Sequence, residues 1–146
     1  MGDFAKEINS KFPNEWVKAL LNIKYTANYF DQIENSFLKP FNISGQQYNI
    51  LRILRGAGEK LKVTVVKERM IQKSPNSTRL MDKLCDKKLI ERTRCEEDRR
   101  VVYIKITKKG LELLNRIKMN EFNDLFINKI SEDEANTLNK LLDKLR

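Results

Sequence analysis

The chain has 146 residues, with 29 Lys and Arg, 20 Asp and Glu, two cysteines and no histidine. This length fits one domain with its own core, and no apolar stretch reaches the roughly 20 residues of a membrane span, so we expect a cytoplasmic protein without a membrane partner. Because histidine, a CxxC pair, a glycine-rich phosphate loop and a nucleophile beside a base are all missing, the sequence predicts no metal site, no cofactor and no enzyme.

The net charge of +9 is concentrated in the central third of the chain. Residues 60–110 hold 16 Lys and Arg against 7 Asp and Glu, a surplus of 9 that equals the net charge of the whole chain. Clustered Lys and Arg displace the counterions condensed on phosphates, so this pattern favours a polyanion as partner. A solvated, lysine-rich surface is the alternative that charge alone leaves open.

Two helices are predicted in the first third of the chain. From Asn14 to Lys39, apolar residues recur at steps of three and four, which is typical of a long amphipathic helix, and Pro40 should end it. Ser44 and Gln47 have the spacing of a capping box, which predicts a second helix from about residue 45 to residue 55.

A helix-turn-helix is predicted next. Residues 61–63 are expected to be extended, ahead of a helix that carries Val66 and Met70. Ser74 is expected to cap the following helix, with Pro75 at its first position. Since the link between the two helices is tight, they form a helix-turn-helix candidate. The inward side of the second helix carries apolar and small residues: Ser77, Leu80, Met81 and Leu84.

Two strands, 89–94 and 101–106, should follow as a β-hairpin whose loop holds five consecutive charges, Glu96 to Arg100. A hairpin directly after a helix-turn-helix defines a winged helix. The fold class is therefore mainly α with a small β-hairpin wing, in a single domain of residues 1–146. Taken alone, the loop could instead be an exposed turn that keeps an edge hairpin soluble.

The closing helices are predicted to dimerise. Thr107 should cap a helix that carries Leu111, Leu114, Phe122, Leu125 and Phe126, and Ser131 a last helix with Ala135, Leu138, Leu141, Leu142 and Leu145 on one stripe. The winged-helix lobe (about 44–107) fills its own core, so helices at about 1–39 and 108–146 need another cover. We expect a homodimer that uses Phe4, Ile8, Phe12, Trp16, Leu138, Leu142 and Leu145. The alternative is that these helices fold over the core of their own chain.

Residues 79–110 contain a series of short motifs: Arg79-Leu80, Leu84, Leu89-Ile90, Asp98-Arg99-Arg100 and Ile106-Thr107-Lys108-Lys109-Gly110. In these motifs the segment resembles the multiple antibiotic resistance regulator (MarR-type) family of winged helix-turn-helix regulators. The chain departs from the family pattern in three places: Lys88 replaces a glycine after the recognition helix, Lys62 replaces a capping hydroxyl, and no cysteine lies near the first helix.

The resemblance implies that double-stranded DNA is the partner, with the second helix of the helix-turn-helix in the major groove and the wing in a minor groove. Asn76, Thr78 and Arg79 are then the candidates for reading bases, while Ser74 would cap and touch phosphate. Lys83, Lys87, Lys88, Arg92, Arg94 and Lys105 would touch phosphates or nothing. In the wing, the family pattern implies that Asp98 pairs with an arginine; the spacing favours Arg100 and leaves Arg99 for the groove, but either assignment stays open.

The function expected from this resemblance is a homodimeric repressor that binds a pseudo-palindromic operator and is released by a small aromatic or anionic effector. Tyr25, Tyr29, Phe30, Tyr48 and Trp16 could line the effector cleft between the lobe and the dimerisation helices, although aromatic residues at helical spacing usually belong to a core. Two alternatives remain: a redox-sensing regulator that uses Cys85 or Cys95, and a winged-helix module that binds protein.

Overall fold

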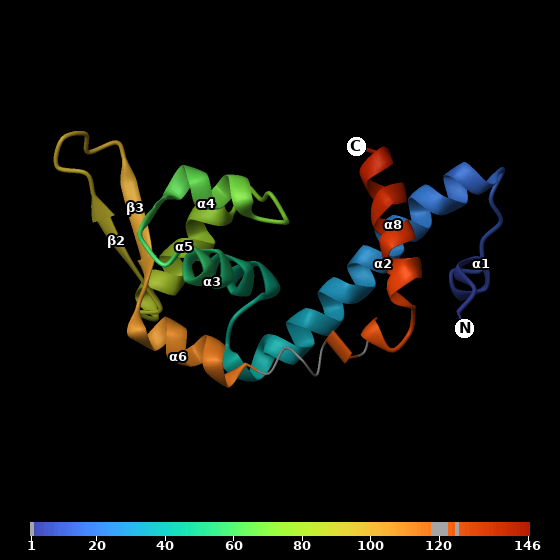
Figure 1. Cartoon of the computed structure of the whole chain (residues 1–146), viewed down its shortest axis with the longest axis horizontal. Coiled ribbons are helices and arrows are strands. Elements are labelled where there is room, and N and C mark those ends of the chain that lie inside the picture. The colour runs from blue at the N-terminus through green and yellow to red at the C-terminus, as the bar shows by residue number, and fades with distance from the viewer. Residues whose placement is uncertain (1, 118–122, 125) are drawn as a thin grey trace.

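The computed structural model describes residues 2–117, 123–124 and 126–146. It consists of a compact lobe at one end and a helical arm at the other (Figure 1). The arm contains α1 (Phe4–Glu7), α2 (Glu15–Leu38) and α8 (Glu132–Lys144). After the short 3-10 helix η1 (Lys39–Phe41), the lobe contains α3 (Gly45–Ala57), β1 (Leu61–Lys62), α4 (Val63–Arg69), α5 (Ser77–Asp86), β2 (Ile90–Arg94), β3 (Val102–Ile106) and α6 (Lys108–Arg116).

The long helix α2 leads from the arm to the lobe. It begins where the Asn14 side chain accepts a hydrogen bond from the amide of Val17 at 2.9 Å, and it ends at Leu38, as the position of Pro40 predicts. Pro40 then lies in η1, and Asn42 takes a left-handed conformation with φ 58°. This left-handed residue turns the chain from the arm into the lobe.

The first helix of the lobe follows local capping rules. Ser44 and Gln47 form the predicted capping box at the start of α3. The helix is two residues longer than predicted, because it ends only where Gly58 adopts a left-handed conformation with φ 68°. A glycine at that position carries no steric penalty, so the helix can run up to it before the chain reverses.

The wing belongs to a three-stranded antiparallel sheet in the order β1-β3-β2. The predicted hairpin is formed by β2 and β3, with Arg92 opposite Ile104. The extended stretch predicted at residues 61–63 supplies the third strand, because Leu61 also pairs with Ile104. Strand β3 is therefore central, and its side chains reach the core of the lobe at Ile104 and Ile106.

The helix after the wing is shorter than the sequence predicted. Thr107 caps it as expected, but α6 ends at Arg116, where Ile117 adopts an extended backbone and is buried in the core of the lobe. Burial of Ile117 holds the chain against the lobe, which the periodicity of the sequence does not reveal. Phe122 and Leu125, predicted for the same helix, lie outside the described residues, while Phe126 packs edge-on against Phe30 of α2.

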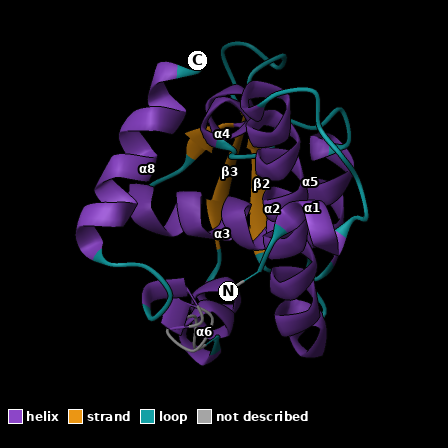
Figure 2. Cartoon of the chain, turned by 90° about the vertical axis from the view of Figure 1, so that its right-hand side faces the viewer, coloured by secondary structure: helices purple, strands orange, loops and turns teal. Residues whose placement is uncertain are grey.

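The apolar stripe of α8 stays uncovered. Ser131 forms the predicted capping box, yet none of the residues of α8 is buried, and the side chains of Leu138, Leu141 and Leu145 are 43%, 57% and 70% exposed. The helix lies away from the lobe in Figure 1, and Figure 2 shows that it is also separated from α2, which it overlaps in Figure 1 only in projection. The alternative in which the closing helix folds over the core of its own chain is therefore wrong.

The N-terminal segment, by contrast, packs on its own arm. Phe4 is buried and stacks on Phe12 with ring centroids 5.2 Å apart, and it contacts Tyr25 at 5.3 Å. These two phenylalanines were predicted at a subunit interface, whereas the structure uses them within one chain. Trp16 remains 84% exposed. Within the described residues, no helix combines the length and apolar character needed to cross a bilayer.

Candidate nucleic-acid interface

The second helix of the helix-turn-helix, α5, begins later than the sequence predicted. Pro75 and Asn76 form a turn in which the Ser74 hydroxyl accepts a hydrogen bond from the amide of Asn76 at 3.1 Å, and the amide of Ser77 donates to the Ser74 carbonyl at 3.2 Å. The N-cap is Asn76, without a side-chain cap. Ser74 thus closes the turn ahead of the helix rather than capping the helix itself, because a bond to an amide only two residues away favours a turn.

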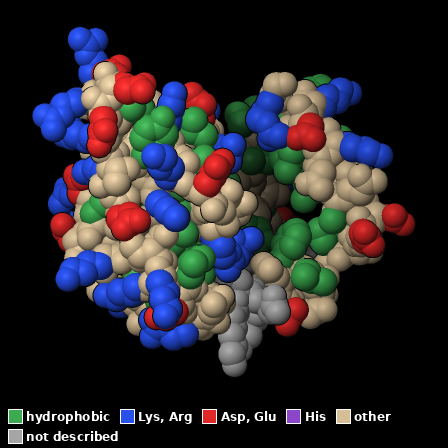
Figure 3. Space-filling view, turned by 60° about the vertical axis from the view of Figure 1, so that its left-hand side comes forward, with side chains coloured by type: hydrophobic (Ala, Val, Ile, Leu, Met, Phe, Trp, Pro, Cys, Tyr) green, Lys and Arg blue, Asp and Glu red, His purple; other side chains and the backbone are tan. Residues whose placement is uncertain are grey.

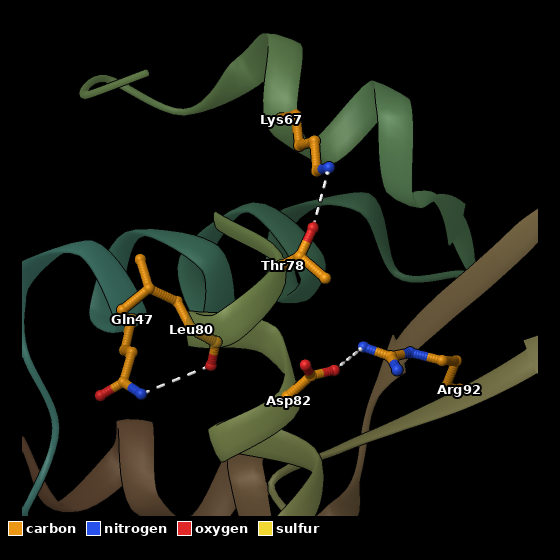
Figure 4. A network of polar contacts seen from close by, with 6 residues as sticks. All are labelled: Gln47, Lys67, Thr78, Leu80, Asp82 and Arg92. Atoms are coloured by element: carbon orange, nitrogen blue, oxygen red, sulfur yellow. Dashed lines mark hydrogen bonds and ion pairs between the residues drawn. The ribbon is translucent and has the colours of Figure 1, made fainter. Parts of the chain in front are cut away.

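The two faces of α5 are divided as predicted. Ser77, Met81 and Leu84 are buried against the lobe, while Arg79 and Lys83 are exposed. Thr78 is also exposed, and its hydroxyl accepts a hydrogen bond from the Lys67 ammonium of α4 at 3.1 Å (Figure 4). The outer face therefore presents a hydroxyl in a fixed position beside a guanidinium and an ammonium, which are groups that donate to base edges and phosphates.

An ion pair joins α5 to the wing. The Arg92 guanidinium of β2 lies 2.7 Å from the Asp82 carboxylate of α5 (Figure 4). We expected Arg92 to touch phosphates or nothing, and this contact within the protein corrects that expectation. Both side chains are partly exposed, so the pair contributes only about 0–1 kcal/mol to stability. Its clearer effect is geometric, since it fixes the side of the helix that faces the hairpin.

Gln47 is a positioning residue that sequence reasoning recognised only as a helix cap. Its side chain is buried; its Oε1 accepts from the amide of Ser44 at 3.0 Å and its Nε2 donates to the carbonyl of Leu80 at 3.4 Å (Figure 4). The cap of α3 therefore also holds the middle of α5. The only sequence signal for this role is a polar residue on the inner side of α3.

The tip of the wing is organised through its backbone. The Asp98 carboxylate accepts a hydrogen bond from the amide of Arg100 at 3.0 Å, and the carbonyl of Asp98 accepts from the amide of Val101 at 3.0 Å. The spacing pointed to Arg100 as the partner of Asp98, but no ion pair between Asp98 and a guanidinium occurs among the described residues. The carboxylate closes the turn because an aspartate reaches a backbone amide two residues on more easily than it reaches a mobile guanidinium. Arg99 and Arg100 are both exposed.

A concave basic surface connects α5 to the wing. Its cavity of about 410 Å³ has Met81 and Val63 on its apolar side and carries six polar or basic residues: Lys62, Thr64, Thr78, Arg92, Arg94 and Arg100. Sequence reasoning had no signal for Lys62 and Thr64, which join this surface only because β1 pairs with β3. Figure 3 shows Lys and Arg side chains spread over this lobe, as the charge distribution predicts.

The two cysteines are free and partly buried. Burial raises the pKa of the Cys85 thiol; Arg92 lowers it, and Asp82 and Asp86 raise it again. A raised pKa reduces the fraction of thiolate, which is the reactive form. The environment of Cys85 thus disfavours its use as a peroxide sensor.

The five aromatic residues proposed for one effector cleft are separated. Tyr25, Tyr29 and Phe30 line a cavity of about 360 Å³ within the arm. Tyr48 instead lines a cavity of about 430 Å³ at the junction of α2 with the lobe. Trp16 lines neither of these cavities. The prediction of one shared cleft is therefore wrong, because Tyr25, Tyr29 and Phe30 of α2 face the arm, whereas Tyr48 belongs to α3 in the lobe.

The junction cavity contains a carboxyl group whose ionisation opposes folding. Burial raises the pKa of Glu34, and the charge of Asp31 raises it further. The raised pKa does not change the free energy of unfolding while Glu34 is protonated in both the folded and the unfolded chain. The protein loses stability as the pH rises through the ordinary pKa of the group, and the loss is complete above the raised pKa.

We expect Glu34→Gln to raise the Tm at pH 7 and to leave it unchanged below about pH 4, as measured by circular dichroism. Glu68→Gln, on the exposed face of α4, is the control; an equal gain at both pH values would contradict the prediction.

A helix-turn-helix joined to a three-stranded sheet with a projecting hairpin defines the winged helix-turn-helix class. Residues 32–117 match the family described as transcriptional regulator SarA/Rot. The multiple antibiotic resistance protein MarR of Salmonella typhimurium is 30% identical over 118 residues, which are 79% of this chain and 81% of that protein.

Solved structures agree with these sequence matches. The MarR transcription factor from Planctomyces limnophilus is 32% identical, with a TM-score of 0.70 over 91% of this chain and 98% of that chain. A mutant MarR from E. coli complexed with operator DNA shares the fold, with a TM-score of 0.72, 24% identity and 99% of each chain covered. The chain belongs to the MarR family of transcriptional regulators, which confirms the resemblance drawn from residues 79–110.

Proposed function

We propose that this chain is a homodimeric repressor that binds double-stranded DNA, with α5 in the major groove and the tip of the wing in the adjacent minor groove. The observation that carries the proposal is the continuous basic surface from the outer face of α5 through the concave cavity to Arg100. It lies in the segment that holds the whole positive excess of the chain. Cations grouped on one surface are what phosphate binding needs. The related MarR from E. coli in complex with operator DNA supports the same choice of partner.

The proposed contacts follow from the position of each residue. Asn76, Thr78 and Arg79, at the start of α5, are assigned to base edges, and Ser74 and Lys83 to phosphates. Arg99 and Arg100 are assigned to the minor groove, where the potential is most negative. Asp98 acts indirectly, since it holds the turn that presents the two arginines.

Dimerisation is proposed from the uncovered apolar residues of the arm. Trp16 and Leu20 of α2 and Leu138 and Leu141 of α8 are exposed, and a second copy of the arm would cover them. Two lobes related by a twofold axis would bind half-sites about 34 to 36 Å apart, one turn of the duplex.

A small aromatic effector is proposed to release the dimer from DNA. The arm cavity supports an aromatic ligand, because Tyr25, Tyr29 and Phe30 offer rings for stacking. Release of a bound fluorescent duplex by simple aromatic acids, but not by aliphatic acids of equal charge, is the result expected.

The DNA-binding proposal is tested by two substitutions with different expected signatures. Arg79→Ala should remove about 1 to 3 kcal/mol of discrimination at one base pair, because it deletes a group that reads a base. Lys105→Ala, on the exposed face of β3, should weaken all duplexes alike and reduce the slope of log K against log salt by about one. Both effects are measured by fluorescence anisotropy with point-substituted duplexes selected from a random library.

Reversal of the two signatures would refute the assignment of these contacts. Binding to duplex DNA that does not depend on salt would refute the proposal itself, because it would exclude counterion release from phosphates.

A further inference from the structure

The arm and the lobe are connected by a short hinge. Between the end of α2 at Leu38 and the start of α3 at Gly45, the chain passes through η1 and the left-handed Asn42. Figure 1 shows α2 leaving the lobe at this point and extending away from it. With so short a connection, small changes in backbone dihedrals would swing the lobe through a large arc, so contacts outside the hinge must fix its direction.

One such contact pins the start of the lobe. The side-chain oxygen of Asn35, in the last part of α2, accepts a hydrogen bond from the amide of Gly45 at 2.8 Å. This amide is one of the donors at the start of α3 that have no partner within the helix, so a residue of the arm supplies the hydrogen-bond acceptor for a helix of the lobe. Leu38, at the end of α2, is also buried in the core of the lobe. Both attachments lie close to the hinge, so the direction of the arm depends further on contacts farther along α2.

A further attachment reaches the turn between α4 and α5. The Gln72 side chain lies between two partners: its Nε2 donates to Asp31 Oδ2 of α2 at 2.7 Å, and its Oε1 accepts from Gln46 Nε2 of α3 at 2.8 Å. The backbone next to it is also held, because the amide of Ile71 donates to Asn49 Oδ1 of α3 at 3.0 Å. We call the side chains of Asp31, Gln72 and Gln46 the junction relay.

The contacts of the junction relay can orient the arm relative to the lobe, but they do not form part of a hydrophobic core. Its hydrogen bonds are exposed and bury no apolar surface, so the lobe does not need them to fold. The NH₂ group of Gln72 donates to a carboxylate of the arm, and its carbonyl oxygen accepts from an NH₂ group of α3, so the side-chain amide pairs a donor with an acceptor on both sides. The bond to the Asp31 carboxylate is charge-assisted and short, which makes it stronger than an ordinary amide contact.

We propose that the junction relay fixes the direction of the helix-turn-helix relative to the arm and thereby selects the spacing between the two half-sites of the operator. The inference rests on the proposed DNA-binding homodimer. In that dimer the arms are joined to each other, so the angle at each junction sets the distance between the two α5 helices. A duplex with the wrong spacing is then bound only by bending a junction away from its preferred direction.

The test uses a duplex that the wild-type chain selects from a random library, together with versions in which the half-site spacing is changed by one or two base pairs. Gln72→Ala deletes both bonds of the relay. We expect it to bind the selected duplex about tenfold more weakly, the equivalent of one charge-assisted hydrogen bond. It should also bind the altered spacings almost as well as the selected one.

A charge swap provides the rescue. Gln72→Glu alone places a second carboxylate against Asp31 and should impair spacing selectivity as Gln72→Ala does. Asp31→Asn combined with Gln72→Glu rebuilds both bonds, because the amide introduced at position 31 can donate to the carboxylate introduced at position 72, to which Gln46 still donates. This double variant should recover most of the affinity and spacing selectivity of the wild type. Gln32→Ala, an exposed glutamine on the same helix, is the matched control and should bind as the wild type does.

The outcomes separate the possible errors. If Gln72→Ala weakens every spacing equally and the swap restores nothing, Gln72 contacts DNA itself and the inference is wrong. If neither single variant alters affinity or spacing selectivity, the relay is an ordinary solvated surface and the inference is wrong as well. If the wild type selects no duplex from the library, the proposed DNA-binding function is wrong, and the inference that rests on it is wrong as well.

Discussion

Replacing Gly110 with alanine should lower the free energy of unfolding by about 3 kcal/mol, at the upper end of the usual cost of overpacking. A Cβ atom at this position would lie 2.3 Å from the carbonyl oxygen of Leu89 and 2.7 Å from Cγ1 of Ile106. The Leu89 carbonyl cannot easily retreat, because it accepts hydrogen bonds from both the amide and the hydroxyl of Thr107 at 3.0 Å. The added methyl group must therefore push α6 away from the end of α5 and the start of β2.

The chain provides a matched control for this substitution. Gly56 lies inside α3, and among the described residues no tertiary neighbour comes within 4 Å of the site of its missing Cβ. Gly56→Ala should stabilise the protein by about 0.5 to 1 kcal/mol, because alanine loses less backbone entropy in a helix. Urea unfolding followed by circular dichroism would measure both changes. Equal stability of the two variants would show that α6 does not pack against Leu89 as the structure describes.

Replacing Leu141 with lysine should abolish the proposed dimer at micromolar concentrations. Leu141 is exposed on the apolar stripe of α8, so in an isolated chain a lysine would cost little. In a dimer that buries this stripe, an ammonium group without a partner would raise the dissociation constant by roughly 100-fold or more, which corresponds to about 3 kcal/mol. Sedimentation velocity would measure the shift from dimer to monomer, and affinity for a two-half-site duplex should fall with it.

The control for this prediction lies on the opposite face of the same helix. Asn136→Lys adds the same charge to α8 away from its leucine stripe, and it should leave the association state unchanged. If Leu141→Lys remained a dimer with unchanged affinity, the stripe of α8 would not be the dimer interface.

Features set by local chemistry were predicted from the sequence. The end of α2 before Pro40 and the capping boxes at Ser44 and Ser131 depend on residues within one turn, and all three are confirmed. The departure at Lys88 was also informative: glycine is absent, yet Lys88 takes the left-handed conformation with φ 61°. Its amide donates to the carbonyl of Cys85 at 2.9 Å, which ties down this unfavourable conformation.

Features set by distant neighbours were not predictable in the same way. Asp82 binds Arg92 because the hairpin folds back beside α5, and the sequence spacing of ten residues carries no sign of that pairing. The end of α6 depends on the burial of Ile117 in a core assembled from other elements. The assignment of particular residues to bases and phosphates remains a prediction, because it depends on a partner and not on the chain alone.

The hydrogen bond between the Cys95 amide and the Val101 carbonyl, at 2.9 Å, closes the wing below its tip. Residues 96–100 beyond this closure are all exposed, whereas the buried contacts of β3 begin only at Ile104. Changes in the length or charge of the tip should therefore have little effect on the free energy of unfolding. In the proposed complex with DNA, mutations of the tip would change operator preference without compensating changes in the hydrophobic interior.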